Sequence, residues 1–366
     1  MRTFLSPPVM NGDTERLLVA KAFDSGYIAP CGPMVDALEQ EVSRQLGFAG
    51  CLATVSGSMA LELLARALSI RPGDVIVASD VTFIASVAPF VSLGAQPVFV
   101  DASPTTWNMD PTLAEIALTR FPNARAMIVT DLYGQSCDID ALSAVCARFH
   151  VPLIVDAAES LGATYRGRPA GKGAWAVIHS LNGNKIITSG GGGLLLSDDL
   201  DLICHCRKLA SQAREATLWY EHYEVGCHGR LGNVPAAIGL GQFWHLKDAL
   251  DDKRRVWEKW NTRFQRYPWI TPMPIATYGV PNFWLTVVML DKRSPVEAVE
   301  LLAAYGIEAR PVWKPMHMQP VFAEAPQVLT GVGEELFEHG LCLPSGRLLD
   351  ETVMDTVMNL LEEMPI

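Results

Sequence analysis

Short apolar runs alternate with longer amphipathic segments over the first two thirds of the chain. The segment that starts at Pro33 keeps Val35, Leu38, Val42 and Leu46 at helical spacing, and similar segments follow most of the apolar runs. The apolar runs, which predict buried strands, are residues 51–55, 75–78, 97–100, 126–130, 153–155, 175–178 and 194–196. Strands that are apolar throughout and alternate with helices are typical of a mostly parallel sheet with helices on both faces. The pattern therefore predicts the α/β class.

The character of the chain changes after Gly239, where a different pattern begins. The elements expected there are a long helix at 244–264, strands at 284–290 and 307–312, and helices at 295–305 and from 351. A proline-rich connection, residues 268–281, follows the long helix. We therefore expect a large domain of residues 1–245, which includes an extended N-terminal arm before Pro33, and a smaller α+β domain of residues 246–366.

Polar segments follow the expected strands of the large domain. They are Ser56-Gly57-Ser58, residues 80–83, residues 131–135 and residues 156–159. In parallel sheets, ligands bind beyond the carboxyl ends of the strands, which meet at one edge. We therefore expect these segments to surround a binding site.

Lys185 lies in the loop between two of the expected strands. A lysine in a loop is most often a solvated charge, and this is the preferred interpretation of the residue taken alone. Here Asn182 and Asn184 flank it, and four glycines at 190–193 let backbone pass close to a bulky neighbour. These neighbours favour a partly buried amine with a lowered pKa, which can form a Schiff base with a carbonyl compound. Pyridoxal phosphate (PLP) is such a compound; it also needs an acid at its pyridine nitrogen, a helix N-terminus at its phosphate and an aromatic ring beside its own.

Three residues at the strand ends suit the ring of PLP. Asp156 ends an apolar strand, so it either caps a turn or pairs with the pyridine nitrogen. Glu159 is either a charge that a helix dipole favours or a partner of the ring hydroxyl. Phe83 has the position to stack on a flat ring, although a lone phenylalanine is more often a core residue.

The segment Ser56-Gly57-Ser58 joins a strand to a helix N-terminus, where free backbone N–H groups attract phosphate. The signal is weak alone, because serine and glycine begin many helices. Ser180 could add a hydroxyl to the same phosphate. A metal site at Cys204-His205-Cys206 is not expected, because residues two apart on a helix point to different faces and no second ligand pair is near in sequence.

Composition and charge exclude several classes of partner. The 366 residues carry a net charge of −11, which argues against nucleic acid or an anionic membrane surface as partner. No apolar run approaches the roughly 18 residues of a membrane span, and the N-terminus lacks the apolar core of a signal peptide. The eight cysteines are scattered, as expected of core thiols that stay reduced. We expect a cytoplasmic protein.

Together these segments resemble the DegT/StrS family of nucleotide-sugar aminotransferases, which are PLP enzymes of fold type I. The motifs that carry the resemblance are Phe4-Leu-Ser-Pro-Pro, Ala22-Phe-Asp-Ser-Gly-Tyr-Ile-Ala-Pro, Asp156-Ala-Ala-Glu-Ser-Leu-Gly-Ala, Asn182-Gly-Asn-Lys-Ile-Ile-Thr, Arg310-Pro-Val-Trp-Lys-Pro-Met-His and Leu341-Cys-Leu-Pro-Ser-Gly. The resemblance implies that Lys185 forms the Schiff base and that Asp156 pairs with the pyridine nitrogen. The implied cofactor contacts are Gly57, Ser58, Phe83, Asp156, Glu159, Ser180 and Lys185, and the implied substrate contacts are Tyr27, Ile28, Asn184 and His317.

Residues 182–188 and 313–317 are most similar to the branch of the family that aminates C4 of UDP-linked 4-keto-6-deoxy-N-acetylhexosamines. The implied reaction takes the amino group from glutamate by a ping-pong mechanism, on a homodimer with shared active sites. One departure is Cys227-His228-Gly229-Arg230, where the family has Tyr-Asn-Tyr-Arg. That asparagine reaches the partner's phosphate in the family, so His228 is the candidate to replace it as a cofactor ligand. Gly190 also replaces a larger residue.

Several alternatives remain beside this interpretation. The substrate could be a TDP-linked keto sugar, or the chain could be a catalytically altered relative that acts as a dimeric binding or regulatory protein, which the departure at 227–229 favours. A sugar 3-dehydratase of the same fold would carry histidine in place of Lys185. A nicotinamide dehydrogenase is disfavoured, because the glycines at 190–193 do not form a Gly-x-Gly-x-x-Gly turn between a strand and a helix.

Overall fold

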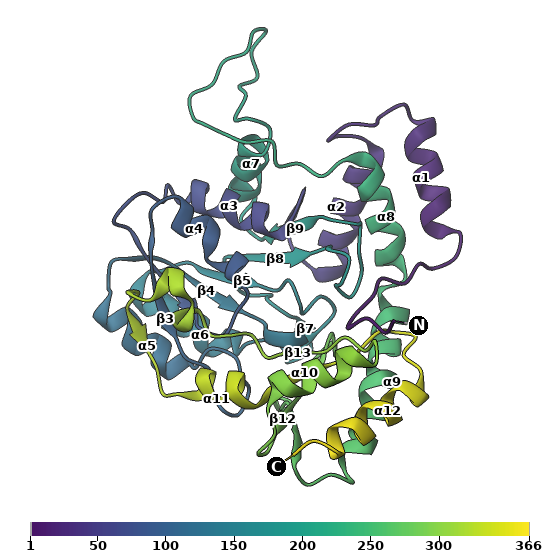
Figure 1. Ribbon diagram of the computed structural model, residues 1–366. Coiled ribbons are helices and arrows are strands. Elements are labelled where there is room, and N and C mark those ends of the chain that lie inside the picture. Colours follow the sequence, from purple (N-terminus) through teal and green to yellow (C-terminus); the bar gives the residue numbers. More distant parts are fainter. Residues whose placement is uncertain (1, 366) are drawn as a thin grey trace.

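A computed structural model describes residues 2–365, which form a large sheet with helices on both faces and a smaller sheet beside it (Figure 1). The large sheet has the strand order β1-β9-β8-β5-β4-β2-β3-β14. Its strands are β1 (Gly50–Thr54), β2 (Val75–Ser79), β3 (Gln96–Val100), β4 (Ala124–Thr130), β5 (Leu153–Asp156), β8 (Ala176–Ser180), β9 (Gly193–Ser197) and β14 (Gln327–Val328). The strands from β8 to β14 pair in parallel, whereas β9 is antiparallel to both of its neighbours. The expected mostly parallel α/β sheet is confirmed.

Two groups of helices cover the faces of this sheet. One face packs on α2 (Pro33–Leu46), α5 (Pro111–Arg120), α6 (Ile139–Phe149) and α8 (Asn233–Trp244). The other packs on α3 (Gly57–Ala67), α4 (Ala88–Ser92) and α7 (Leu200–Leu209). Neighbouring residues of β5 point to opposite faces, Ile154 toward the α3 side and Val155 toward the α2 side. Both faces are therefore buried, which explains why the strands are apolar throughout.

The C-terminal residues form a second, antiparallel sheet with its own core. Its strand order is β10 (Ile270–Pro272), β12 (Thr286–Leu290), β15 (Gly340–Leu343) and β13 (Arg310–Pro311). The helices α9 (Leu246–Phe264), α10 (Pro295–Ala304), α11 (Val332–His339) and α12 (Glu351–Glu362) accompany it, and the fully buried Trp260 belongs to its core. However, β14 comes from this region and pairs with β3 at the edge of the large sheet. The division at residue 245 therefore stays a prediction.

The N-terminal arm differs from the fully extended segment that we expected. It contains the helix α1 (Thr14–Asp24), which packs on α8 through Leu18 and Ala22. Residues 3–9 contain no helix and contact the C-terminal region, where the Thr3 N–H donates to the Gly306 carbonyl and the Ser345 N–H donates to the Leu5 carbonyl. Within residues 2–365, no helix is long and apolar enough to cross a bilayer.

Candidate functional site

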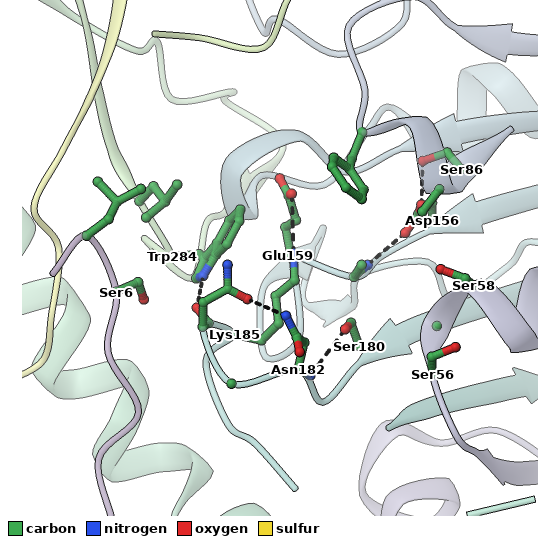
Figure 2. Close-up of a pocket in the computed structure, with 18 of the residues that line it drawn as sticks. Ser6, Ser56, Ser58, Ser86, Asp156, Glu159, Ser180, Asn182, Lys185 and Trp284 are labelled. Atoms are coloured by element: carbon green, nitrogen blue, oxygen red, sulfur yellow. Dashed lines mark hydrogen bonds and ion pairs between the residues drawn. The ribbon is translucent and has the colours of Figure 1, made fainter. Parts of the chain in front are cut away.

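A cavity of about 890 Å³ opens at the carboxyl ends of the large sheet. Residues that follow β1, β2, β5 and β8 line one side of it, and the N-terminal arm and the C-terminal sheet line the other. Parallel strands that end at a common edge bring these segments together, although they are far apart in sequence. Figure 2 shows Lys185 near the centre, with Ser56, Ser58 and Ser180 toward one end and Ser6 toward the other.

Lys185 projects into this cavity from a turn in which its N–H donates to the Asn182 carbonyl. Its Nζ lies 3.5 Å from Oε1 of Glu159 and 4.0 Å from the centre of the Trp284 ring. The Trp284 indole N–H donates to the Asn184 carbonyl at 2.6 Å, so the ring is fixed against the turn that carries the lysine. The amine is therefore confined between a carboxylate and an aromatic face. Trp284 was not among the expected site residues.

Of the glycines after Lys185, Gly193 is needed for a close approach between strand and helix, whereas Gly190 and Gly191 have open space around them. A Cβ on Gly193, the first residue of β9, would collide with the backbone of Ser56 and Gly57. The Ser56 hydroxyl caps α3 by accepting from the Met59 N–H at 3.0 Å. Because α3 begins at Gly57, its first N–H groups have no partner within the helix and face the same end of the cavity as Ser58 and Ser180.

Asp156 is buried at the end of β5, on the floor of the cavity. Its Oδ2 accepts from the Ser86 hydroxyl at 2.5 Å, and its Oδ1 accepts from the Ala158 N–H at 3.1 Å. Burial raises the pKa of the Asp156 carboxyl, while these two donors and the charge of Lys185 oppose the rise. The carboxyl is thus poised to gain from a further cationic or N–H partner inside the cavity.

Glu159 is also buried, on the other side of Lys185. Its Oε2 accepts from the Tyr133 N–H at 2.7 Å, and Tyr133 adopts a left-handed backbone conformation there, with φ of 50°. Burial raises the pKa of Glu159 to about 7, against the opposing charge of Lys185. Burial and the neighbouring amine thus act on this carboxyl in opposite directions.

An aromatic wall closes the cavity above these carboxylates. Phe83 is half exposed and its ring centre lies 5.8 Å from that of Trp313. The Trp313 ring centre in turn lies 5.2 Å from that of Tyr133, and the backbone N–H of Trp313 donates to the Tyr133 hydroxyl at 3.0 Å. The wall therefore leaves one face of Phe83 available to a flat ring.

These features fit PLP. The cavity offers one partly buried amine, a buried carboxylate, a helix N-terminus and an accessible aromatic face, which are the four partners that this cofactor needs. Within residues 2–365, no group of three or more His, Cys, Asp or Glu residues is placed to bind a metal ion.

The model of the DegT/DnrJ/EryC1/StrS aminotransferase family matches residues 10–362. This protein belongs to that family. The chain is 39% identical over 369 residues to the putative pyridoxal phosphate-dependent aminotransferase EpsN of Bacillus subtilis (strain 168), covering 98% of this chain and 95% of the relative. It is 33% identical to the GDP-perosamine synthase of Caulobacter vibrioides, covering 99% of this chain and 98% of the relative. Among solved structures, DesI in the presence of its TDP-sugar product superposes with a TM-score of 0.91 at 25% identity, covering 98% of this chain and 92% of the DesI chain.

Membership of the DegT/DnrJ/EryC1/StrS family confirms three expectations. The fold is that of fold type I, the cofactor is PLP, and the protein is a PLP-dependent sugar-nucleotide aminotransferase. The individual site residues are not tested by family membership, so their roles stay predictions.

Most of the expected site residues of this aminotransferase line the cavity. They are Gly57, Ser58, Phe83, Asp156, Glu159, Ser180, Asn184 and Lys185. Tyr27, Ile28 and His228 do not line it; they are exposed on the surface of the single chain. The His228 ring lies 3.3 Å from the Gln212 amide, on a long loop that projects beyond α7 (Figure 1).

His317 lies behind the cavity wall. Its Nδ1 is 2.7 Å from Oδ2 of the buried Asp80, and its Nε2 is 3.1 Å from Oε1 of Glu334. The hydrogen bond to Asp80 is the main cause of a raised pKa for His317. Both ring nitrogens are therefore engaged by carboxylates, and a sugar would have to displace Glu334 to bind this ring.

Proposed function

We propose that this aminotransferase moves the amino group of glutamate to C4 of a nucleotide-linked 4-keto-6-deoxy sugar, with a UDP-linked N-acetylhexosamine as the first candidate. The observation that carries the proposal is the single lysine amine of the cavity, confined between Glu159 and Trp284 and close to a buried aspartate. The resemblance of residues 182–188 and 313–317 supports the UDP-linked substrate. The relatives named for GDP- and TDP-linked sugars support the wider class of nucleotide sugars.

Each part of the cavity has a role in this proposal. Lys185 Nζ would carry PLP, Asp156 would face the pyridine nitrogen, and Phe83 would cover the ring. The α3 N-terminus would hold the phosphate, with Ser58 and Ser180. When bound, PLP supplies a protonated ring that withdraws electrons from the carbon that loses a proton.

Lys185 acts a second time, as a base, once the amino donor has displaced it. Its Nζ would then accept the proton that the donor carbon loses and hold it for the transfer that completes the half-reaction, and the same amine would supply a proton to the keto-sugar carbon in the second half-reaction. Glu159 lies within reach of Nζ and compensates its charge when the amine is protonated. Trp284 excludes water from one side of the amine.

Tyr27, Ile28, Asn184 and His317 are the proposed substrate contacts. Tyr27 and Ile28 are exposed and lie outside the cavity of one chain, so these two contacts need a second copy, and we propose a homodimer with shared sites. His317 is held by Asp80 and Glu334 of its own chain. Exposed apolar side chains on the projecting loop support the homodimer; they are Leu218, Trp219, Tyr220, Tyr223 and Val225.

All eight cysteines are free thiols, which supports the cytoplasm as the compartment.

Incubation with glutamate and a panel of UDP-, TDP- and GDP-linked 4-keto sugars tests the proposal, with the aminated product identified by mass spectrometry. Glutamate alone should release one equivalent of 2-oxoglutarate per Lys185 before any sugar is added, as a ping-pong mechanism requires. If no keto sugar of the panel accepts nitrogen, the proposed reaction is wrong. Absence of the 2-oxoglutarate release would instead favour the binding or regulatory relative.

A further inference from the structure

The charges of the cavity are unbalanced for the substrates that it must admit. Three carboxylates line it, from Asp156, Glu159 and Glu308. Among the described lining residues, the cationic side chains are those of Lys185 and Arg310. Lys185 loses its charge as a free ammonium when it binds a cofactor, and the cofactor phosphate adds negative charge. Arg310 then remains as the one cationic side chain that this lining offers to an anionic substrate.

The fold holds Arg310 at the mouth of the cavity. It is the first residue of β13 and pairs with Cys342 of β15, another lining residue. Its Nη2 donates to Oε1 of Glu308 at 2.9 Å, while Oε2 of Glu308 accepts from the Leu5 N–H at 3.0 Å. One carboxylate therefore fixes both the guanidinium and the N-terminal arm.

The arm marks the end of the cavity where Arg310 lies. Ser6, the neighbour of Leu5, is at the side opposite Ser56 and Ser58, with Lys185 between them (Figure 2). A ligand that starts at Lys185 and extends away from the phosphate end therefore reaches the arm. The Arg310 side chain is 66% exposed there and keeps donors that Glu308 does not use.

We propose that Arg310, oriented by Glu308, is the residue that binds the oxyanion group of the substrate at the arm side of the cavity. This inference rests on the proposed function, since both of its substrates are anionic. The group is either a carboxylate of the amino donor or the diphosphate of the nucleotide sugar. A planar guanidinium donates two parallel hydrogen bonds to either group, which a lysine ammonium does not.

Equilibrium binding separates this inference from turnover. The PLP-loaded protein is titrated by calorimetry with 2-oxoglutarate in one arm of the experiment and with UDP in the other. Arg310→Gln should lower the affinity for one or both probes by about ten- to a hundredfold, the range for lost hydrogen bonds to a charged group. Arg310→Lys should lose less affinity, because it keeps the charge but not the paired donors. Loss for 2-oxoglutarate alone identifies the carboxylate, and loss for UDP alone identifies the diphosphate.

Arg44→Gln is the matched control. Arg44 donates to Glu41 at 2.7 Å with exposed fractions of 68% and 23%, close to the 66% and 21% of Arg310 and Glu308, but it lies on α2 and does not line the cavity. The Arg44→Gln variant should therefore bind 2-oxoglutarate and UDP with the same affinities as the unmodified protein. The inference is overturned if Arg310→Gln, correctly folded by circular dichroism, changes neither affinity by more than about twofold. It is also overturned if the unmodified protein binds neither probe at millimolar concentration. A protein that shows the Arg310 effect but aminates no keto sugar would refute the proposed function and leave this inference standing.

Discussion

Asp156 and Glu159 are both buried beside Lys185, yet different donors hold them. Asp156 accepts from a side-chain hydroxyl, Ser86, that belongs to a buried network with Thr82 and Thr130. Glu159 accepts from a backbone N–H, and the pKa that burial gives it is about 7. Asp156 also accepts from the Ala158 backbone N–H, but in Ser86 it has a hydroxyl donor that can reorient when a partner binds, as a residue that pairs with a ring nitrogen should have.

We expect Asp156→Asn to abolish most turnover while the fold is retained. The amide can still accept from Ser86, but it cannot favour a protonated ring nitrogen, and each lost unit of pKa is worth about 1.4 kcal/mol or tenfold in rate. Steady-state kinetics with glutamate and the accepted keto sugar measure this. The surface variant Asp140→Asn, which removes a partner of Arg166 and Arg168, should leave the rate unchanged. Near-normal turnover of Asp156→Asn would remove this residue from the mechanism.

His317 joins the cavity wall to the end of β2. Asp80, which follows β2, accepts from both the His317 backbone N–H at 2.9 Å and the ring at 2.7 Å, and burial raises the pKa of Asp80. The neighbouring charges are Asp101 beside Asp80 and Glu334 on the far side of the ring. The His317 ring therefore lies between two carboxylates, with a third, Asp101, beside Asp80.

His317→Ala should cost more stability at pH 6 than at pH 9. The pKa of His317 is raised above its ordinary 6.5, so its contribution is fully present below that value and is lost as pH rises through the folded pKa. Urea unfolding of both proteins at the two pH values measures the difference. Glu334→Gln is the control, because Glu334 is half exposed and should contribute less than about 1 kcal/mol. An equal loss at both pH values would mean that the ring acts through packing alone.

The chemical type of these site residues could be predicted from the sequence, but the side chains that contact them could not. Lys185, Asp156 and Ser58 follow apolar strands, and a parallel sheet brings such positions to one edge whatever the details of the loops. Trp284 and Ser86 were missed, because nothing local distinguishes a tryptophan or a serine that will meet a residue 99 or 70 positions away. His317 was expected at the substrate, but the carboxylates that engage it come from β2 and α11, which no local pattern reveals.

At the scale of elements, α9 buries a lysine that connects three segments. Lys253 Nζ donates to the Ser6 hydroxyl at 2.9 Å, the Trp284 carbonyl at 2.9 Å and the Ser345 carbonyl at 2.7 Å. Burial, together with the charge of Arg347, lowers the pKa of Lys253 to about 7. Lys253 therefore hydrogen-bonds both the N-terminal arm, through Ser6, and Trp284, whose ring covers Lys185.

The stability difference between the protein and its Lys253→Met variant should grow with pH from about 7 to 10. The folded pKa is near 7 and the ordinary value is 10.5, so the unfolded chain binds more protons in this window and the stability of the unmodified protein rises with pH. The slope is at most about 1.4 kcal/mol per pH unit. Urea unfolding at pH 7 and pH 9 measures it for both proteins. Lys247→Met, at an exposed position of the same helix, should show no such trend, and the same trend in both variants would contradict the assignment.

Helices and strands were predictable where their burial leaves a clear pattern of apolar residues in the sequence. The strands of the large sheet are buried on both faces, so their apolar runs predict them directly. The helix α1 was missed, because only Leu18, Ala22 and Glu15 are buried and its apolar residues also face solvent. The strand β14 was missed as well, since two residues at the edge of a sheet leave no pattern.

At the scale of the whole molecule, one chain does not bring all of the expected site residues together. The cavity collects the cofactor-facing residues, but Tyr27, Ile28 and His228 point to solvent from other parts of the surface. The loop that carries His228 is held at its base by the Val55 N–H, which donates to Gly229, and by the Gly229 N–H, which donates to Ala210. A Cβ at Gly229 would crowd Met59, so a tyrosine there would require this side chain to move. The base of the loop is therefore ordered, and its apolar tip lacks cover within the chain.

A mixture of two inactive variants should recover activity if sites are shared between copies. Lys185→Ala removes the amine from the cavity, whereas His228→Ala removes the group that we expect to reach the partner's phosphate. In a mixed dimer, one site combines the intact Lys185 of one copy with the intact His228 of the other, so it should bind PLP normally and turn over. The measurement is the rate at limiting PLP after the two purified variants are unfolded and refolded together, with each variant refolded alone as the control. Analytical ultracentrifugation should show a dimer in all three samples. Activity of the mixture that equals the sum of the separate variants would place His228 outside the partner's site, and an active monomer would refute the shared dimer altogether.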